Sequence, residues 1–200
     1  MPPSRRPRAL LVALAAMGPI FLTGAPQARA EGAADPVRGT QTAVRLFNQG
    51  CIRNLRQESG LREVLQAAGL RPAPAEQATL HLGGRPGTLF VSNDPGSPVA
   101  VIVRPAAAQC EVRAPTTDIS VAEGEFRNMV ESLAGPRVMI RRDSEERSSA
   151  GGRPGITMVF SAGAPPLEEG GARFAMQARQ PVPGGIALSM TASGQPIDAR

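Results

Sequence analysis

Apolar residues recur with a helical period in three stretches of the chain. In residues 43–55, Val44, Phe47, Cys51 and Leu55 follow steps of three and four, which places them on one side of an amphipathic helix. A shorter helix with the same period is predicted over residues 61–68, before Gly69 and the prolines that follow it. Ser120 and Glu123 form a capping-box pattern that opens a third helix, which ends before Gly135.

Elsewhere the period is two, as in β-strands. Strands are predicted over residues 88–92, 99–103 and 109–114, then over 138–142, and finally around 156–160, 174–178 and 186–190. A polar loop is expected over 143–155, and the stretch 75–82 is ambiguous between a helical turn and a short strand. The resulting order is helix–helix–βββ–helix–ββββ. Short turns between successive strands imply antiparallel pairing, so the sequence predicts an α+β fold: a twisted antiparallel sheet with helices on one face in a two-layer arrangement.

The first thirty residues have the pattern of a secretory signal peptide. A basic start (Arg5, Arg6 and Arg8) precedes an Ala- and Leu-rich run, and Ala28-Arg29-Ala30 supplies a cleavage site after Ala30. An uncleaved membrane anchor is the alternative. The predicted organisation is therefore a cleaved leader (1–30), a flexible N-terminus (31–42), one α+β domain (43–193) and a tail (194–200). The expected location is the periplasm, with no membrane span after cleavage.

Charge argues against nucleic acid as a partner. Four of the 22 basic residues lie in the leader, which leaves 18 basic residues against 17 acidic ones in the mature chain. Nucleic-acid binding needs a clustered positive excess, and a nearly neutral mature chain does not supply it.

The two cysteines, Cys51 and Cys110, would both enter an oxidising compartment, where a disulfide is expected. In the stretch 109–114, Cys110, Val112 and Ala114 share the buried side of the predicted strand, and Cys51 lies on the apolar side of its helix. The sequence thus predicts a buried helix-to-sheet disulfide with a Cα–Cα distance of about 4.4–6.8 Å. Closing a loop of roughly 60 residues should stabilise the fold by about 4 kcal/mol.

Familiar catalytic and metal-binding patterns are not found. His81 is the single histidine, no G-x-S-x-G motif accompanies it, and no zinc-ligand spacing occurs. The pairs Glu145-Glu146 and Glu168-Glu169 fall in predicted loops and are interpreted as solvated charges. Met158, Met176 and Met190 face inward, where core packing is favoured over Cu(I) binding. We therefore expect no cofactor and no metal, and a non-enzymatic protein.

An enzyme is the rival hypothesis. A hydrolase or transferase of the cell envelope could use a carboxylate- or arginine-based site, which would show as a cleft lined by Asp118, Glu111 or Glu123.

The outward side of the last strands is the candidate binding surface. The alternation places polar residues there: Thr157, Ser161, Arg173, Gln177, Arg179, Ser189 and Thr191. If helices cover only the other side, this surface is open to a protein or small-molecule partner. A plain solvated sheet face is the alternative.

One short repeat occurs. The pentapeptide GGRPG is found at 83–87 and again at 151–155, each time directly before a predicted strand. Recurrence of a Gly/Pro turn by chance is favoured over duplication, because nothing beyond the pentapeptide aligns. A phosphate-cradling role for Arg85 or Arg153 is a weaker alternative, since neither turn leads into a helix.

Several of these features occur together elsewhere. A signal peptide, a helix with one cysteine, the turn and strand GRPGTLF, and a second cysteine in CEV resemble a family of uncharacterised exported proteins of Gram-negative bacteria, over roughly Val44 to Ala134. The resemblance implies export and the disulfide and supplies no site residues. We expect a periplasmic binding or interaction module of the cell envelope.

Overall fold

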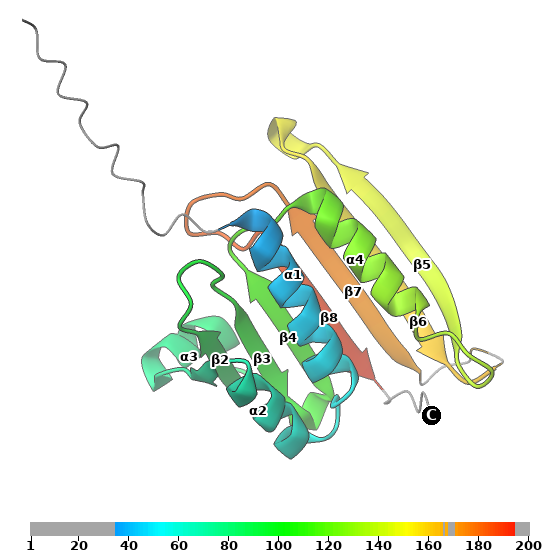
Figure 1. The fold of residues 1–200 in the computed structure, drawn as a ribbon, viewed down its shortest axis with the longest axis horizontal. Helices are drawn as coiled ribbons and strands as arrows, with labels where there is room; N and C mark the ends of the chain where they lie inside the picture. Colours follow the sequence, from blue (N-terminus) through cyan, green and yellow to red (C-terminus); the bar gives the residue numbers. More distant parts are fainter. Residues whose placement is uncertain (1–34, 166, 168–170, 195–200) are drawn as a thin grey trace, which may run out of the picture. The chain divides into compact units, whose positions relative to one another are not determined.

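The computed structural model describes residues 35–165, 167 and 171–194 (Figure 1). Over these residues the chain is an α+β protein with four α-helices and one eight-stranded antiparallel sheet. The α+β class and the antiparallel sheet are thus confirmed. The leader (1–30), the tail from residue 195 and most of the 165–171 turn lie outside the described residues.

The helices are α1 (Pro36–Leu46), α2 (Glu58–Ala67), α3 (Ala75–Leu82) and α4 (Ile119–Glu131), and a π-helix, Phe47–Ile52, continues α1. The strands are β1 (Leu70–Pro72), β2 (Thr88–Ser92), β3 (Ala100–Arg104), β4 (Gln109–Ala114), β5 (Met139–Ser148), β6 (Gly155–Gly163), β7 (Ala172–Arg179) and β8 (Leu188–Gly194). Their order in the sheet is β1-β2-β3-β4-β8-β7-β6-β5.

The structure contains two elements, β1 and α3, that the predicted order lacks. Strand β1 has only three residues, too few to show a period, and α3 occupies the stretch that the pattern left ambiguous. The predicted loop 143–155 is also wrong, because β5 runs on to Ser148. After Ile140, the inward positions of β5 carry the charged residues Arg142, Glu145 and Arg147, so this part of the edge strand lacks the alternation that marks the others.

Helix α1 begins earlier than expected. Pro36 to Thr42 are helical, although the pattern predicted a flexible segment as far as residue 42. The Asp35 side chain caps the helix by accepting hydrogen bonds from the backbone N–H groups of Val37 (3.0 Å) and Arg38 (3.3 Å). Thr40 is fully buried, and its hydroxyl accepts a hydrogen bond of 3.0 Å from the Asp118 N–H at the start of α4. A small polar residue at a buried position gives no apolar signal in the sequence.

Helices α1 and α4 contact each other and lie side by side against the sheet (Figure 1). The core between them and the sheet contains Phe47, Phe126, Phe160 and Phe174, with successive ring centroids 6.0–6.5 Å apart. Met158, Met176 and Met190 are directly paired across β6, β7 and β8 and belong to this core, each at most 1% exposed. Their predicted inward orientation is confirmed.

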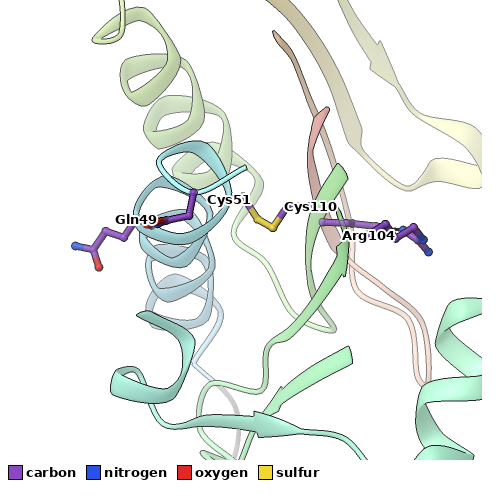
Figure 2. The surroundings of a disulfide bond; sticks show 6 residues. Gln49, Cys51, Arg104 and Cys110 are labelled. Atoms are coloured by element: carbon purple, nitrogen blue, oxygen red, sulfur yellow. Dashed lines mark hydrogen bonds and ion pairs between the residues drawn. A yellow bond between two sulfur atoms is a disulfide. The ribbon is translucent and has the colours of Figure 1, made fainter. Parts of the chain in front are cut away.

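The Cys51–Cys110 disulfide is present and joins the π-helix to β4. The Cα atoms are 5.3 Å apart, and both residues are at most 1% exposed. Figure 2 shows the bridge between helix and sheet, with Arg104 pointing away from it. The predicted pairing, burial and distance are all confirmed. The helix that carries Cys51 is not one regular α-helix over 43–55, because its second half is π-helical.

None of the described helices is long and apolar enough to cross a membrane.

Candidate functional site

The open face, as we name it, consists of the outward positions of β5–β8. Neighbouring antiparallel residues share a face, so the pairs Gln177–Thr157 and Arg173–Ser161 place these residues opposite the core. Ser189 and Thr191 of β8 continue the same surface. Arg173, Gln177 and Arg179 are exposed, and Thr157 and Ser161 are half-buried. All five residues predicted for the candidate surface therefore lie on one accessible face.

A polar cluster forms at one end of the open face, around Asp143. A β-bulge between Arg142 and Ser144 interrupts the alternation of β5 and turns the Asp143 side chain outward. The carboxylate accepts hydrogen bonds from the Ser161 hydroxyl (2.5 Å) and from Nε of Arg141 (2.9 Å). Arg173 on β7 contributes a further positive charge nearby.

These neighbours set the titration of Asp143. Partial burial alone would raise the pKa of its carboxyl, because it disfavours the charged form. The hydrogen bonds from Ser161 and Arg141 and the positive charges of Arg141 and Arg173 act in the opposite direction and prevail. The pKa of Asp143 is therefore lowered from its ordinary value of 3.8, so the group is a carboxylate at neutral pH.

A hollow of about 320 Å³ lies at the other end of the open face, between β6 and β7. Two of the lining residues are charged, and both are arginines, Arg153 and Arg179. The Arg179 guanidinium donates a hydrogen bond to the side-chain oxygen of Gln177, which also lines the hollow. The lining residues that the structure describes are Ser148, Arg153, Pro154, Gly155, Ile156, Thr157, Gln177, Ala178, Arg179, Gln180 and Val182.

A second group of charges lies on the same side of the sheet but is buried. Glu111 accepts two hydrogen bonds from Arg113, at 2.6 and 2.9 Å, and one of 3.0 Å from the Ser189 hydroxyl. Arg104, 6% exposed, lies 3.8 Å from the same carboxylate and donates a hydrogen bond of 3.4 Å to Gln109. This arrangement, which we name the Glu111 cluster, fixes the central strands to one another.

The carboxylates proposed for a rival catalytic cleft are not brought together. Asp118 caps α4 by accepting a hydrogen bond from the Val121 N–H. Glu123 pairs with Arg127 and Arg147 on the helix side of the sheet, while Glu111 lies in its cluster on the opposite side. Each of the three carboxylates thus has a structural partner of its own.

Glu145 also differs from its predicted role as a solvated loop charge. It lies on β5 and forms ion pairs with Arg127 (3.0 Å) and with Arg142 of the same strand (2.8 Å), and the first of these joins α4 to this edge strand. Glu168-Glu169 lies outside the described residues. His81 is half-buried near the end of α3.

Reasoning from sequence missed Asp143 and Ser148. The pattern predicts a loop for both, and only the pairing of β5 with β6 shows that they face Ser161 and Gly155. The repeat GGRPG did single out Arg153, although it gave no indication of the hollow.

Within the part of the chain that the structure describes, no group of three or more His, Cys, Asp or Glu residues could hold a metal ion. No family model, curated protein or solved structure matches this chain.

Proposed function

We propose that this protein is a binding module of the cell envelope, exported to the periplasm, and that its open face binds an acidic partner. The observation that carries the proposal is the accessibility of a polar, arginine-bearing sheet face. The core residues of β6–β8 pack against α1 and α4, whereas Arg173, Gln177 and Arg179 on the other side are exposed.

Charge complementarity supports an acidic partner. Four arginines lie on the open face or at its edge: Arg141, Arg153, Arg173 and Arg179. Two acidic residues, Asp143 and Glu146, lie among them, and Asp143 is already paired with Arg141. The mature chain is almost neutral, so this surface is locally more positive than the chain as a whole. Such a surface attracts acidic partners and repels basic ones.

Export is supported by the leader sequence and by the chemistry of the two cysteines. A buried disulfide between helix and sheet suits an oxidising compartment. The resemblance to uncharacterised exported proteins points the same way, so we propose cleavage after Ala30 and a periplasmic location.

Site-specific photocrosslinking in cells that export the full chain tests this proposal. A crosslinking amino acid at Gln177, on the open face, should give a discrete adduct. The same crosslinking amino acid in place of Glu63, which is exposed on α2 on the helix side, should give no adduct. Arg173→Glu should reduce the Gln177 adduct, because it reverses the charge next to the contact.

Equal adducts at Gln177 and Glu63 would overturn the proposal, and so would the absence of any adduct at Gln177 in correctly exported protein. An adduct that Arg173→Glu leaves unchanged would exclude an acidic partner.

A further inference from the structure

We propose that the hollow between β6 and β7 is a binding site for a small organic oxyanion, with Arg153 and Arg179 holding its carboxylate or phosphate group. This inference rests on the proposed function, because the hollow forms one end of the open face. It adds a chemical class of ligand and the residues that would recognise it.

The first argument is charge. Arg153 and Arg179 are both exposed, and neither forms an ion pair with a residue that the structure describes. Among the residues that the structure describes, no acidic one lines the hollow. The nearest acidic residue by register is Glu146, which pairs with Thr157 from β5 and is not part of the lining. Two guanidinium groups without a counter-charge favour an oxyanion, which arginine can bind through two parallel hydrogen bonds.

The second argument is shape. A volume of about 320 Å³ is at the lower end of the range for small-molecule sites. Gly155 keeps this space open: a Cβ atom there would lie 2.9 Å from Oγ of Ser148 and 3.3 Å from the carbonyl oxygen of Ala178. The strand floor is therefore bare at the point where a side chain would project.

The third argument is the mixture of groups in the wall. Ser148, Thr157 and Gln177 offer hydroxyl and amide groups, while Pro154 and Val182 provide apolar surface. A bare inorganic ion would leave the apolar part unused. A carbon skeleton of a few atoms that bears a charged end would use both parts.

The Arg179 side chain is oriented, and the turn that carries Arg153 is fixed, before any ligand arrives. Arg179 is oriented by its hydrogen bond to Gln177. Arg153 belongs to a turn that is tied to the end of β7, because the N–H of Gln180 donates a hydrogen bond of 3.0 Å to the carbonyl of Pro154. Such pre-organisation reduces the entropy lost when a ligand binds.

The repeated pentapeptide supplies a matched control. Arg85 occupies the same position in the first GGRPG, and φ is positive at the first two glycines of both turns: 57° and 74° at Gly83 and Gly84, and 63° and 73° at Gly151 and Gly152. Arg85 is exposed like Arg153, but it does not line the hollow. Arg85→Ala and Arg153→Ala therefore remove the same side chain from two turns of identical sequence.

The test is a titration of the purified, oxidised mature protein, followed through backbone amide shifts in NMR spectra. The probes are succinate, glycerol 3-phosphate and inorganic phosphate, with the uncharged succinamide and glycerol as controls. We expect succinate or glycerol 3-phosphate to shift the amides of Thr157, Gln177 and Arg179. Inorganic phosphate should bind more weakly, and the neutral probes should not bind. The preferred anion distinguishes a carboxylate ligand from a phosphate ester.

Arg153→Ala and Arg179→Ala should each weaken the Kd of the bound probe by about tenfold, the loss expected for one charge-assisted contact near the surface. Arg85→Ala should leave the Kd unchanged. Since these side chains are exposed, the variants should keep the wild-type circular dichroism spectrum, which confirms folding.

The inference fails if no anion shifts the amides around the hollow, or if Arg85→Ala weakens binding as much as Arg153→Ala. Its failure is separable from that of the proposed function. Crosslinks at Gln177 without anion binding would exclude the small-ligand site and support the interaction face. Anion binding without crosslinks would support the small-ligand site and exclude the interaction face.

Discussion

The two halves of this protein share one strand order and differ in how the outward side of the sheet is covered. Each half contains four antiparallel strands after a helix that packs on the core: α1 with β1–β4, and α4 with β5–β8. The N-terminal half also contains α2 before β1 and α3 between β1 and β2. The last strands of the halves, β4 and β8, pair with each other at the centre. GGRPG precedes the second strand in both halves, with positive φ at the first two glycines of each copy.

In the N-terminal half the outward side is buried. Leu89 and Ile102 project away from the main core, yet they are only 1% and 0% exposed. Helix α3 contacts β2, and its Leu82 lies beside the Arg104 side chain, which also points outward. In the C-terminal half the corresponding outward side carries exposed arginines. The half that contains α3 therefore has a buried outward side, and the other half has an accessible one.

The largest effect should come from removing the disulfide, which lies in the N-terminal half. The double variant Cys51→Ala/Cys110→Ala should lower the free energy of unfolding by about 4 kcal/mol, because the unfolded chain regains the freedom of a 59-residue separation. Urea denaturation of the oxidised wild type and of the variant measures this difference. A loss below about 1 kcal/mol would contradict the prediction.

Burial on the outward side can be tested at two positions of one cross-strand row of the sheet. Ile102→Ala, in the covered half, should cost about 3 kcal/mol through lost burial and the cavity that remains. Thr191→Ala lies in the same cross-strand row, two strands away on half-buried surface, and should stay within about 0.5 kcal/mol of wild type. Similar losses from both substitutions, measured by chemical denaturation, would show that the halves are equally covered.

The carboxylates of the two halves should differ as well. Glu111→Gln leaves Arg104 and Arg113 with no negative partner at a largely buried site, which should destabilise the protein by about 3 kcal/mol. Asp143→Asn breaks an exposed pair with Arg141 and should cost less than about 1 kcal/mol. Thermal unfolding of the two variants compares these costs directly, and a larger loss for Asp143→Asn would reverse the comparison.

The smallest effect concerns pH. The folded-state pKa of Asp143 is lowered below 3.8, so its carboxylate contributes stability that is present above that pH and is lost as the pH falls through the folded-state pKa. Carboxyl carbon shifts measured by NMR titration should give this pKa. Ser161→Ala should raise it by removing one hydrogen bond to the charged form. A pKa unchanged in Ser161→Ala would show that the contact has no electrostatic effect.

Elements and the orientation of their side chains could be predicted mainly where apolar residues recur with the period of a helix or a strand. Cys51 and Cys110 lie where the helical and strand periods placed them, and the inward methionines of β6–β8 follow the two-residue alternation. Such periods are local properties, because an element exposes one side to solvent and buries the other. Where an inward position holds a polar group, as at Thr40 on α1 or Glu145 on β5, the period disappears and the prediction fails.

The candidate site was predictable only in part for the same reason. The residues of β6 and β7 on the open face follow from alternation. The position of Asp143 depends on a bulge, and Arg153 and Arg179 line one hollow because a turn after β5 is tied to the end of β7. Neither arrangement has a counterpart in the local pattern.

The sequence by itself therefore determined the secondary-structure class, the disulfide and the side of each regular strand that faces the core, since these depend on neighbouring residues and on redox chemistry. Only the tertiary structure decided that β4 and β8 pair, that α3 accompanies a covered half, and that two arginines from different elements share one hollow. These features depend on contacts between segments distant along the chain, which are fixed by the packing of the whole sheet.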